Sequence, residues 1–377
     1  MTGALDPVGL LRDAVACPSP SGQEAALARL LVERMRGSMD EAFVDEAGNA
    51  VGVWGEGGVT VTVLGHIDTV PGAIEVREVA GELHGRGSVD AKGSFCAAVA
   101  AVSGLEPELR HRLRVRLIGA VEEESPSSKG ARHALRVYER PDVLVIGEPS
   151  GWDAYTLGYK GRLVVGLEVE RANAHSSRDE ATAAEAAVEG YGAIRGFVDA
   201  DNAGAGLQAA DRVGDDTGVG SGTARGRFDA LQLSLQALAS ENDGLRQRCR
   251  AMLSFRLPLR WAPEALEDRL RALTLPAGSE LSFGGREVAV RHPRDSAVAR
   301  AFRVAIRSAG GRPRGKVKTG TSDMNVVARA WQVPTLAYGP GDSALDHTPE
   351  ERLSVAEYLR AVEVWRGALG QLAGRPA

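Results

Sequence analysis

The first half of the chain alternates strand-like and helix-like segments, and this alternation constrains the fold more than any other feature of the sequence. β-branched and apolar runs at 59–65, 113–121 and 142–147 predict strands, and apolar residues at helical spacing predict helices between them at 92–105 and 127–135. A strand–helix–strand–helix–strand order is typical of a mostly parallel sheet with helices on both faces. We therefore predict an α/β fold for this part of the chain.

Two further elements precede the parallel strands. Residues 23–36 carry apolar side chains at helical spacing after the turn-forming stretch SPSG, which predicts an amphipathic helix. Residues 49–55 are strand-like, and only the Glu56–Gly58 turn separates them from the strand at 59–65. We expect these two strands to pair as a β-hairpin.

A second pattern begins after Gly161. It runs strand, helix, two strands, helix and strand, at residues 162–170, 182–198, 228–238, 250–258, 263–273 and 280–290. This order suits a small ferredoxin-like α+β domain, with a long loop expected at 199–227. Because the α/β pattern resumes near residue 292, we predict one domain made of residues 1–158 and 292–377 and a second, inserted domain at 159–291.

The composition excludes several classes of protein. A net charge of -5 and a pI near 5.9 give no general attraction to nucleic acid or to an anionic membrane. No apolar run approaches the roughly 18 residues of a membrane span, and the N-terminus lacks the pattern of a secretory signal. Cys17, Cys96 and Cys249 are too far apart for a disulfide framework or a metal clip. We expect a cytoplasmic protein with no nucleic-acid or membrane partner.

Ionisable side chains directly follow each of the three predicted parallel strands: His66 and Asp68, Glu122–Glu124, and Glu148. Ligands of an open parallel sheet bind beyond the carboxyl ends of its strands, so these groups share one edge of the sheet. Asp90, just before the helix at 92–105, and His347, in a loop rich in glycine and proline, are further candidates for this edge.

Each of these side chains alone has an ordinary structural explanation, because most histidines at strand ends are hydrogen-bonded residues and most acidic turns are solvated. Together they are harder to explain in this way, since crowded carboxylates raise one another's pKa unless a cation compensates them. Two histidines with four or five carboxylates suit zinc or a similar divalent ion, whereas calcium prefers oxygen ligands alone. The sequence therefore predicts a metal site.

Several motifs make the chain resemble a known family, and they occur in the order GHIDTVPG, GRGSVDAKG, VEEESPSSKGA, IGEPS, YKGR, NAHSS, KTGTSD and YGPGDSALDHTPEE. From about residue 60 to 355 the chain resembles the two-zinc amidohydrolases and peptidases that include aminoacylase, acetylornithine deacetylase and succinyl-diaminopimelate desuccinylase. It looks most like the branch that releases lysine or ornithine from an acidic amino-group carrier protein in lysine and arginine biosynthesis.

The resemblance implies a zinc-peptidase-like catalytic domain that binds two Zn²⁺ ions per subunit, with Co²⁺ as an alternative. His66 and Glu148 would bind one ion, Glu124 and His347 the other, and Asp90 both. In the family, the peptide bond that follows the bridging aspartate is cis.

The family pattern Asp-Glu-Glu separates the roles of the three glutamates. Aligned by order, Glu123 is the general base and Glu124 the metal ligand, whereas a shift by one residue would make Glu122 the base. Asp68 would orient His66. The implied reaction is amide hydrolysis, in which the base takes a proton from water and passes it to the leaving amine.

The resemblance also implies residues that contact the substrate. His175 would stabilise the oxyanion, often in the site of the other subunit, which implies a homodimer formed through the inserted domain, with that domain acting as a lid. Its alternative reading is a surface histidine after a strand. The residues matching positions that hold the substrate are Arg256, Asn242, Gly320, Thr321 and Ser322.

Residues 310–320 carry a basic run, Arg312, Arg314, Lys316 and Lys318, directly before the TGTSD loop. Such a run is usually a solvated face or a nucleic-acid patch. Beside a predicted active site in an acidic protein, we interpret it as a docking surface for an acidic carrier protein.

Other functions fit parts of the same sequence. A small-molecule deacylase acting on acetylornithine or succinyl-diaminopimelate is the runner-up, although a desuccinylase is expected to show GGTSD where this chain has TGTSD. A related aminopeptidase is a further alternative. A non-catalytic binding relative would lack a ligand or the base, and none is missing here.

Overall fold

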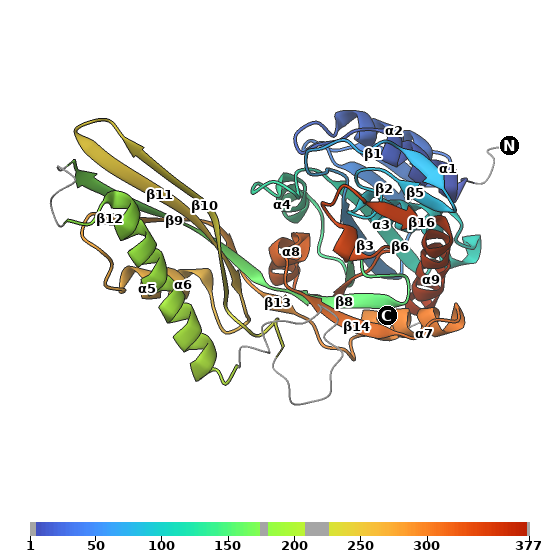
Figure 1. Cartoon of the computed structure of the whole chain (residues 1–377). Coiled ribbons are helices and arrows are strands. Elements are labelled where there is room, and N and C mark those ends of the chain that lie inside the picture. The colour runs from blue at the N-terminus through green and yellow to red at the C-terminus, as the bar shows by residue number, and fades with distance from the viewer. Residues whose placement is uncertain (1–4, 174–179, 208–225, 375–377) are drawn as a thin grey trace. The chain divides into compact units, whose positions relative to one another are not determined.

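The computed structural model of the chain describes residues 5–173, 180–207 and 226–374. The chain divides into two compact units (Figure 1): unit 1 comprises Met1–Gly158, His292–Lys316 and Ser322–Ala377, and unit 2 comprises Tyr159–Arg291 and Val317–Thr321. Each unit has its own buried apolar core.

The main sheet of unit 1 has the strand order β1-β2-β6-β3-β7-β15-β8. These strands are β1 (Glu41–Val44), β2 (Ala50–Trp54), β3 (Val59–His66), β6 (Leu113–Ala120), β7 (Val143–Gly147), β8 (Ala154–Tyr159) and β15 (Thr335–Ala337). The central strands β6, β3, β7 and β15 are parallel, so the predicted α/β fold is confirmed. A small antiparallel sheet contains β4 (Arg77–Val79), β5 (Glu82–His84) and β16 (Arg352–Ser354).

Helices cover both faces of this sheet (Figure 1). One core contains residues of α1 (Pro7–Ala16), α2 (Ala25–Met35), α3 (Lys92–Ser103), α7 (Ala297–Ser308) and α9 (Val355–Ala373). On the other side of the sheet from α7 and α9 lie α4 (Lys129–Val137) and α8 (Asp323–Trp331). Short 3-10 turns occur at η1 (Pro107–Leu109) and η3 (Ser343–Leu345). α3 is buried from Lys92 to Val102, and its many small side chains let it pack closely against the sheet.

The predicted hairpin of residues 49–55 and 59–65 is wrong. β6 lies between β2 and β3, antiparallel to β2 and parallel to β3. The connecting turn is bound to the segment that enters β6, because Glu56 and Val59 donate their N–H groups to the carbonyls of Arg110 and Arg112. β2 forms its hairpin with β1 instead.

Unit 2 follows the predicted order, with β9 (Gly161–Ala172), α5 (Ala183–Gly204), β10 (Gln232–Asn242), β11 (Arg246–Leu257), α6 (Pro263–Arg271) and β12 (Ser279–Glu287). The antiparallel sheet order β10-β11-β9-β12 is the ferredoxin-like arrangement. The predicted loop at 199–227 begins too early, because α5 continues to Gly204, and residues 208–225 of that loop lie outside the described residues. β13 (Val290–Arg291) and β14 (Arg314–Lys318) stand near the boundaries between the units along the chain.

Two general properties of the described residues bear on the predicted class of protein. None of their helices combines the length and apolarity that a membrane span requires. Cys17, Cys96 and Cys249 are free thiols, and the last two are buried.

Candidate metal centre

The candidate centre lies at the carboxyl ends of three adjacent strands of unit 1. β3 lies between β6 and β7, so the acidic residues that follow those two strands flank His66, the last residue of β3. The start of α3 at Lys92 brings Asp90 to the same edge, and the loop after η3 brings His347. The structure therefore brings the five predicted metal ligands together.

Asp90 is the shared member of two groups of ligands. Its Oδ1 lies 3.0 Å from Nε2 of His66, and its Oδ2 lies 3.1 Å from Nε2 of His347. Glu148 adds an oxygen 3.7 Å from Nε2 of His66, and Glu124 adds one 2.8 Å from Nε2 of His347. Each imidazole is thus accompanied by two carboxylates, of which one is common to both.

The chemistry of this donor set fits two divalent cations of the zinc type, because each group offers one imidazole nitrogen and carboxylate oxygens. One ligand atom each of His66, Asp90 and Glu124 lies within 4.8 Å of the others. Hydrogen bonds with Asp90 and Glu124 raise the pKa of His347 to about 10. The two carboxylates therefore stabilise a positive charge beside them, even though the side chain of His347 is half exposed to solvent.

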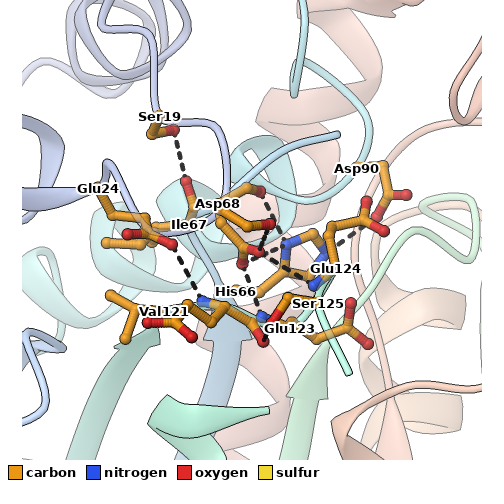
Figure 2. Close-up of polar contacts among 12 residues, drawn as sticks. Ser19, Glu24, His66, Ile67, Asp68, Asp90, Val121, Glu123, Glu124 and Ser125 are labelled. Atoms are coloured by element: carbon orange, nitrogen blue, oxygen red, sulfur yellow. Dashed lines mark hydrogen bonds and ion pairs between the residues drawn. The ribbon is translucent and has the colours of Figure 1, made fainter. Parts of the chain in front are cut away.

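Asp68 connects His66, at the end of β3, to the turn after β6 that carries Glu123 and Glu124 (Figure 2). His66 donates from Nδ1 to the main-chain oxygen of Asp68 at 3.0 Å, which leaves Nε2 to face Asp90. The buried carboxylate of Asp68 accepts the N–H groups of Glu123 and Glu124, both at 3.0 Å (Figure 2). It also accepts a hydrogen bond from the Ser21 hydroxyl at 2.7 Å. One side chain thereby fixes the turn that carries two of the three glutamates.

The three glutamates point to different surroundings. Glu122 has a left-handed backbone (φ 58°), and its N–H is held by Glu24 at 3.1 Å. Its carboxylate accepts a hydrogen bond from Ser127 at 2.7 Å and pairs with Lys129 at 3.4 Å. Glu124 meets His347, as described above. The structure thus turns Glu122 toward α4 and places Glu124 among the predicted ligands.

Glu123 is half-buried among acidic groups. Burial raises its pKa well above the usual value, and the charges of Asp323, Glu148 and Glu124 raise it further, while His66 opposes this effect. Asp323, the first residue of α8, belongs to the KTGTSD motif but is not among the predicted site residues. A carboxyl group with such a raised pKa is suited to holding a proton near neutral pH.

Glu351 is a residue of this centre that sequence reasoning missed. It is fully buried, and its Oε1 accepts the N–H groups of Val89 and Asp90 at 3.0 and 3.1 Å. Its Oε2 pairs with Arg86 at 2.8 Å. Glu351 therefore ties the loop that carries His347 to the loop that carries Asp90. The peptide bond between Asp90 and Ala91 is cis, as the resemblance implies.

The predicted substrate residues are only partly brought together. In unit 2, Nη1 of Arg256 donates to Oγ1 of Thr321 at 3.2 Å, and Gly320 precedes Thr321 in the same loop. The hydroxyl of Ser322 caps α8. Asn242 pairs with Gln247, nine residues from Arg256 along β11, or about 30 Å at the usual rise of a strand. Asn242 and Arg256 thus lie at opposite ends of one sheet, and His175 lies outside the described residues.

The basic run at 310–318 is less free than the sequence indicates. Lys318 is buried, and Nζ of Lys316 donates to the carbonyl of Ser150 at 2.8 Å. Arg314 pairs with Asp153 at 2.6 Å. A docking surface built from this run would therefore depend mainly on the exposed Arg312.

Comparisons with known proteins agree with this geometry. Residues 62–371 match the family model described as Peptidase family M20/M25/M40. The [LysW]-lysine hydrolase of Deinococcus radiodurans is 54% identical to this chain, over 97% of this chain and 96% of that protein. A protein of Thermococcus kodakarensis, provisionally named [LysW]-lysine/[LysW]-ornithine hydrolase, is 35% identical over 99% and 94% of the two chains.

A solved structure shows the same fold at low sequence identity. The M20 family metallo-carboxypeptidase Sso-CP2 from Sulfolobus solfataricus superposes with a TM-score of 0.77 at 18% identity, over 98% of this chain and 99% of that chain. Because the family match spans most of the chain and the relatives are similar over nearly their full length, this chain belongs to the M20/M25/M40 peptidase family and is a metal-dependent hydrolase.

Proposed function

We propose that this hydrolase cleaves the amide bond between a glutamate side chain of an amino-group carrier protein and the α-amino group of lysine, with ornithine as a second substrate. The observation that carries the choice of substrate is the 54% identity to a [LysW]-lysine hydrolase over 370 residues. The arrangement of Asp90 between two histidines supports the reaction class.

The two groups of ligands would each hold one divalent ion, which we assign as Zn²⁺ or Co²⁺. His66 and Glu148 would bind the first ion, His347 and Glu124 the second, and Asp90 both. Bound ions of this kind activate water and polarise the amide carbonyl. Asp68 would keep His66 in the tautomer whose Nε2 faces the ion.

Glu123 is proposed as the group that moves the proton. Its backbone is fixed by Asp68, and among the described residues it forms no ion pair with His66 or His347. It would accept a proton from the attacking water and donate it to the nitrogen of the leaving lysine. Glu122 is not suited to this step, because its carboxylate is engaged by Ser127 and Lys129.

We also infer a homodimer that associates through unit 2. β10 is an edge strand whose residues from 234 to 242 are exposed, including Leu235 and Leu238. An exposed apolar edge is a ready surface for strand pairing. Because Asn242 and Arg256 lie at opposite ends of the sheet, one unit 2 cannot place both on one small reacting group. Asn242 is therefore assigned to the site of the other subunit.

The expected setting of the enzyme is the cytoplasm. Its cysteines are free thiols, and a reducing compartment keeps thiols in that state. The carrier protein supplies the acidic partner, and the neighbourhood of Arg312 remains the proposed contact for it.

A Glu123→Gln substitution tests the proposed function, with Glu122→Gln as the matched control on the neighbouring residue. Glu123→Gln should lower kcat on carrier-linked lysine by about 10²- to 10⁴-fold without lowering metal content, because a general base is lost but no ligand is. Glu122→Gln should keep kcat within a few fold of wild type. A reversed result would move the base to Glu122.

The wild-type enzyme is assayed in parallel on carrier-linked lysine, carrier-linked ornithine, acetylornithine and succinyl-diaminopimelate. A higher kcat/KM on either of the two small acylated substrates would replace the proposed function by that of a small-molecule deacylase.

A further inference from the structure

Residues 19–24, which precede α2, lie beside the turn that follows β3. The hydroxyl of Ser19 donates to the carbonyl of Ile67 at 2.7 Å (Figure 2), and the carbonyl of Ser19 accepts the N–H of Thr69 at 2.9 Å. Ser21 donates its N–H to the carbonyl of Thr69 at 3.3 Å. This segment, in which the sequence predicts only the start of a helix, is thus attached to the turn that carries Asp68.

Glu24 is the last residue of this segment, and its carboxylate does not serve the helix that follows. It occupies the N-cap position of α2, where a polar side chain usually accepts an N–H group of the first helical turn, but it makes no such hydrogen bond. Instead, its Oε1 accepts the N–H of Gly22 at 2.8 Å and that of Glu122 at 3.1 Å. Glu24 is only 5% exposed, and a buried carboxylate is unfavourable unless such donors compensate it. The carboxylate is therefore directed to the turn after β6 rather than to α2.

The N–H group that Glu24 accepts from this turn belongs to a residue with a left-handed backbone. Glu122 has φ 58°, which residues with a Cβ atom disfavour, and such a conformation persists where its surroundings hold it. A change of this φ angle would rotate the chain that follows, beginning with Glu123. The contact from Glu24 therefore helps to decide where the side chain of Glu123 points.

Two buried carboxylates together hold three successive N–H groups of the turn. Asp68 accepts those of Glu123 and Glu124, and Glu24 accepts that of Glu122. Glu124 has a further contact within the centre, so its place depends less on the start of the turn. Loss of the hydrogen bond at Glu122 should therefore disturb Glu123 more than Glu124.

We propose that Glu24 is a positioning residue, which aims the carboxylate of Glu123 at the metal centre by holding the N–H of Glu122. This inference rests on the proposed function, which assigns Glu123 as the base. Glu24 acts through the backbone of the turn and takes no part in proton transfer itself. A displacement of about 1 Å caused by a change far from the chemistry can cost about 100-fold in rate, so a hydrogen bond at this place is able to control the reaction.

Two substitutions separate the geometry of Glu24 from its charge. Glu24→Gln removes the charge but keeps an acceptor oxygen at the position of Oε1, whereas Glu24→Asp keeps the charge but withdraws both oxygens by one methylene group. If Glu24 positions the turn, Glu24→Asp should lower kcat by about 10- to 100-fold, and Glu24→Gln by less than about threefold. KM and the content of bound zinc should stay within about twofold of wild type in both variants, because neither the ligands nor the substrate contacts are changed.

A control variant tests whether any loosening of this region has the same effect. Leu27→Ala removes a fully buried side chain of α2 but changes no hydrogen bond of the turn after β6. It should lower the unfolding temperature more than Glu24→Asp does, because aspartate is itself a favoured N-cap residue, yet keep kcat within about threefold where the protein is folded. An equal loss of kcat in Leu27→Ala, a Glu24→Gln variant as impaired as Glu24→Asp, a loss confined to KM, or full activity of Glu24→Asp would each overturn the inference.

The proposed function can fail separately. If the wild-type enzyme cleaves acetylornithine rather than carrier-linked lysine, the same comparison is made on that substrate, since the role of Glu123 does not depend on the acyl donor. A crystal structure of Glu24→Asp gives a readout that needs no substrate, because the carboxylate of Glu123 should move by at least about 1 Å from its place in crystals of wild type, while Glu124 stays. A turn that superposes on that of wild type would overturn the inference, whichever substrate the enzyme cleaves.

Discussion

At the scale of single residues, one buried carboxylate positions both a proposed ligand and the proposed base. Asp68 accepts the N–H groups of Glu123 and Glu124. Burial acts to raise the pKa of Asp68, but the hydrogen bonds with His66, Ser21 and Glu123 outweigh it, so the pKa lies below its usual value. Its ionised form is therefore the one that the fold stabilises. The geometry of the turn after β6 thus depends on a residue that follows β3.

Asp68→Asn should weaken this turn, because its NH₂ group would face a backbone N–H in place of an acceptor oxygen. We expect kcat to fall by about 10- to 100-fold with a lower unfolding temperature, as is usual when a residue that orients metal ligands is changed. Ser21→Ala removes only one hydrogen bond to the same carboxylate and should cost less than about threefold. Steady-state kinetics with metal analysis measures both, and full activity of Asp68→Asn would contradict the assigned role.

Glu351→Gln tests the link between the loops of Asp90 and His347. The carboxylate of Glu351 now faces three donors: the N–H groups of Val89 and Asp90, and the guanidinium of Arg86. In Glu351→Gln the NH₂ group of the amide, itself a donor, would face one of these donors in place of an acceptor oxygen. We expect metal affinity to fall by about 10- to 100-fold, and the free energy of unfolding to fall by about 3 kcal/mol. Chelator competition and thermal unfolding provide the measurements, with the exposed Glu350→Gln as control. Unchanged metal affinity would leave Glu351 a purely structural residue.

The residues that could be predicted from the sequence differ physically from those that could not. His66 and Glu148 stand at the ends of recognisable strands, and the sheet itself brings strand ends together. Glu351 binds Asp90 from 261 positions away, and no local pattern reveals such a contact. The contact of Glu122 could not be predicted from the sequence for the same reason. Its N–H donates to Glu24, which lies 98 positions away in the segment before α2.

At the scale of elements, the periodicity of apolar residues predicted the type of each element, helix or strand. It predicted less well which strands pair with each other. The parallel strands and α3 were found because a run of apolar residues fixes the type of element. The prediction of a hairpin was wrong because a short turn between two strands also allows a third strand to lie between them. Here β6 lies between β2 and β3. β15 and β16, of three residues each, are too short to give a pattern.

Lys160 joins β8 and β9 to the segment that enters β10, and its ammonium group gives this joint a pH dependence. Nζ donates to the carbonyls of Arg227 and Ala230 and to Gln232. Burial, with help from nearby arginines, lowers its pKa to about 7. Between about pH 7 and 10 the unfolded chain therefore binds more protons than the folded one, so the contribution of Lys160 to stability rises with pH in this window.

Thermal unfolding of wild type and Lys160→Gln at pH 7, 8 and 9 checks this expectation, since the difference between the two proteins cancels the titration of other groups. The difference should shift in favour of wild type by up to about 1.4 kcal/mol per pH unit, and should be constant below pH 7, where Lys160 is protonated in both states. A difference that does not change between pH 7 and 9 would show that Lys160 keeps an ordinary pKa.

At the scale of the whole molecule, the two units divide the chemistry of the proposed reaction. All five proposed metal ligands and Glu123 belong to unit 1, whereas Arg256 and Thr321, which were predicted to contact the substrate, belong to unit 2. Asn242, on β10, lies at the opposite end of the unit 2 sheet from Arg256, and we proposed above that it acts in the site of the other subunit. That proposal predicts that activity depends on association.

Leu238→Lys tests this dependence on the exposed edge strand β10. Leu238 is 48% exposed there, and a lysine should oppose strand pairing between copies through charge repulsion. Val304→Lys is the matched control, because Val304 is 40% exposed on α7 and belongs to unit 1. Sedimentation velocity should show monomers for Leu238→Lys and dimers for Val304→Lys and wild type. The monomer should retain its metal but lose at least about 100-fold in kcat. It would lack the contact that Asn242 of the other subunit is proposed to make at the reacting group, and loss of a single donor to the oxyanion costs about that much. A monomeric Leu238→Lys with full activity would place every catalytic group within one chain, and the assignment of Asn242 to the other subunit would be wrong.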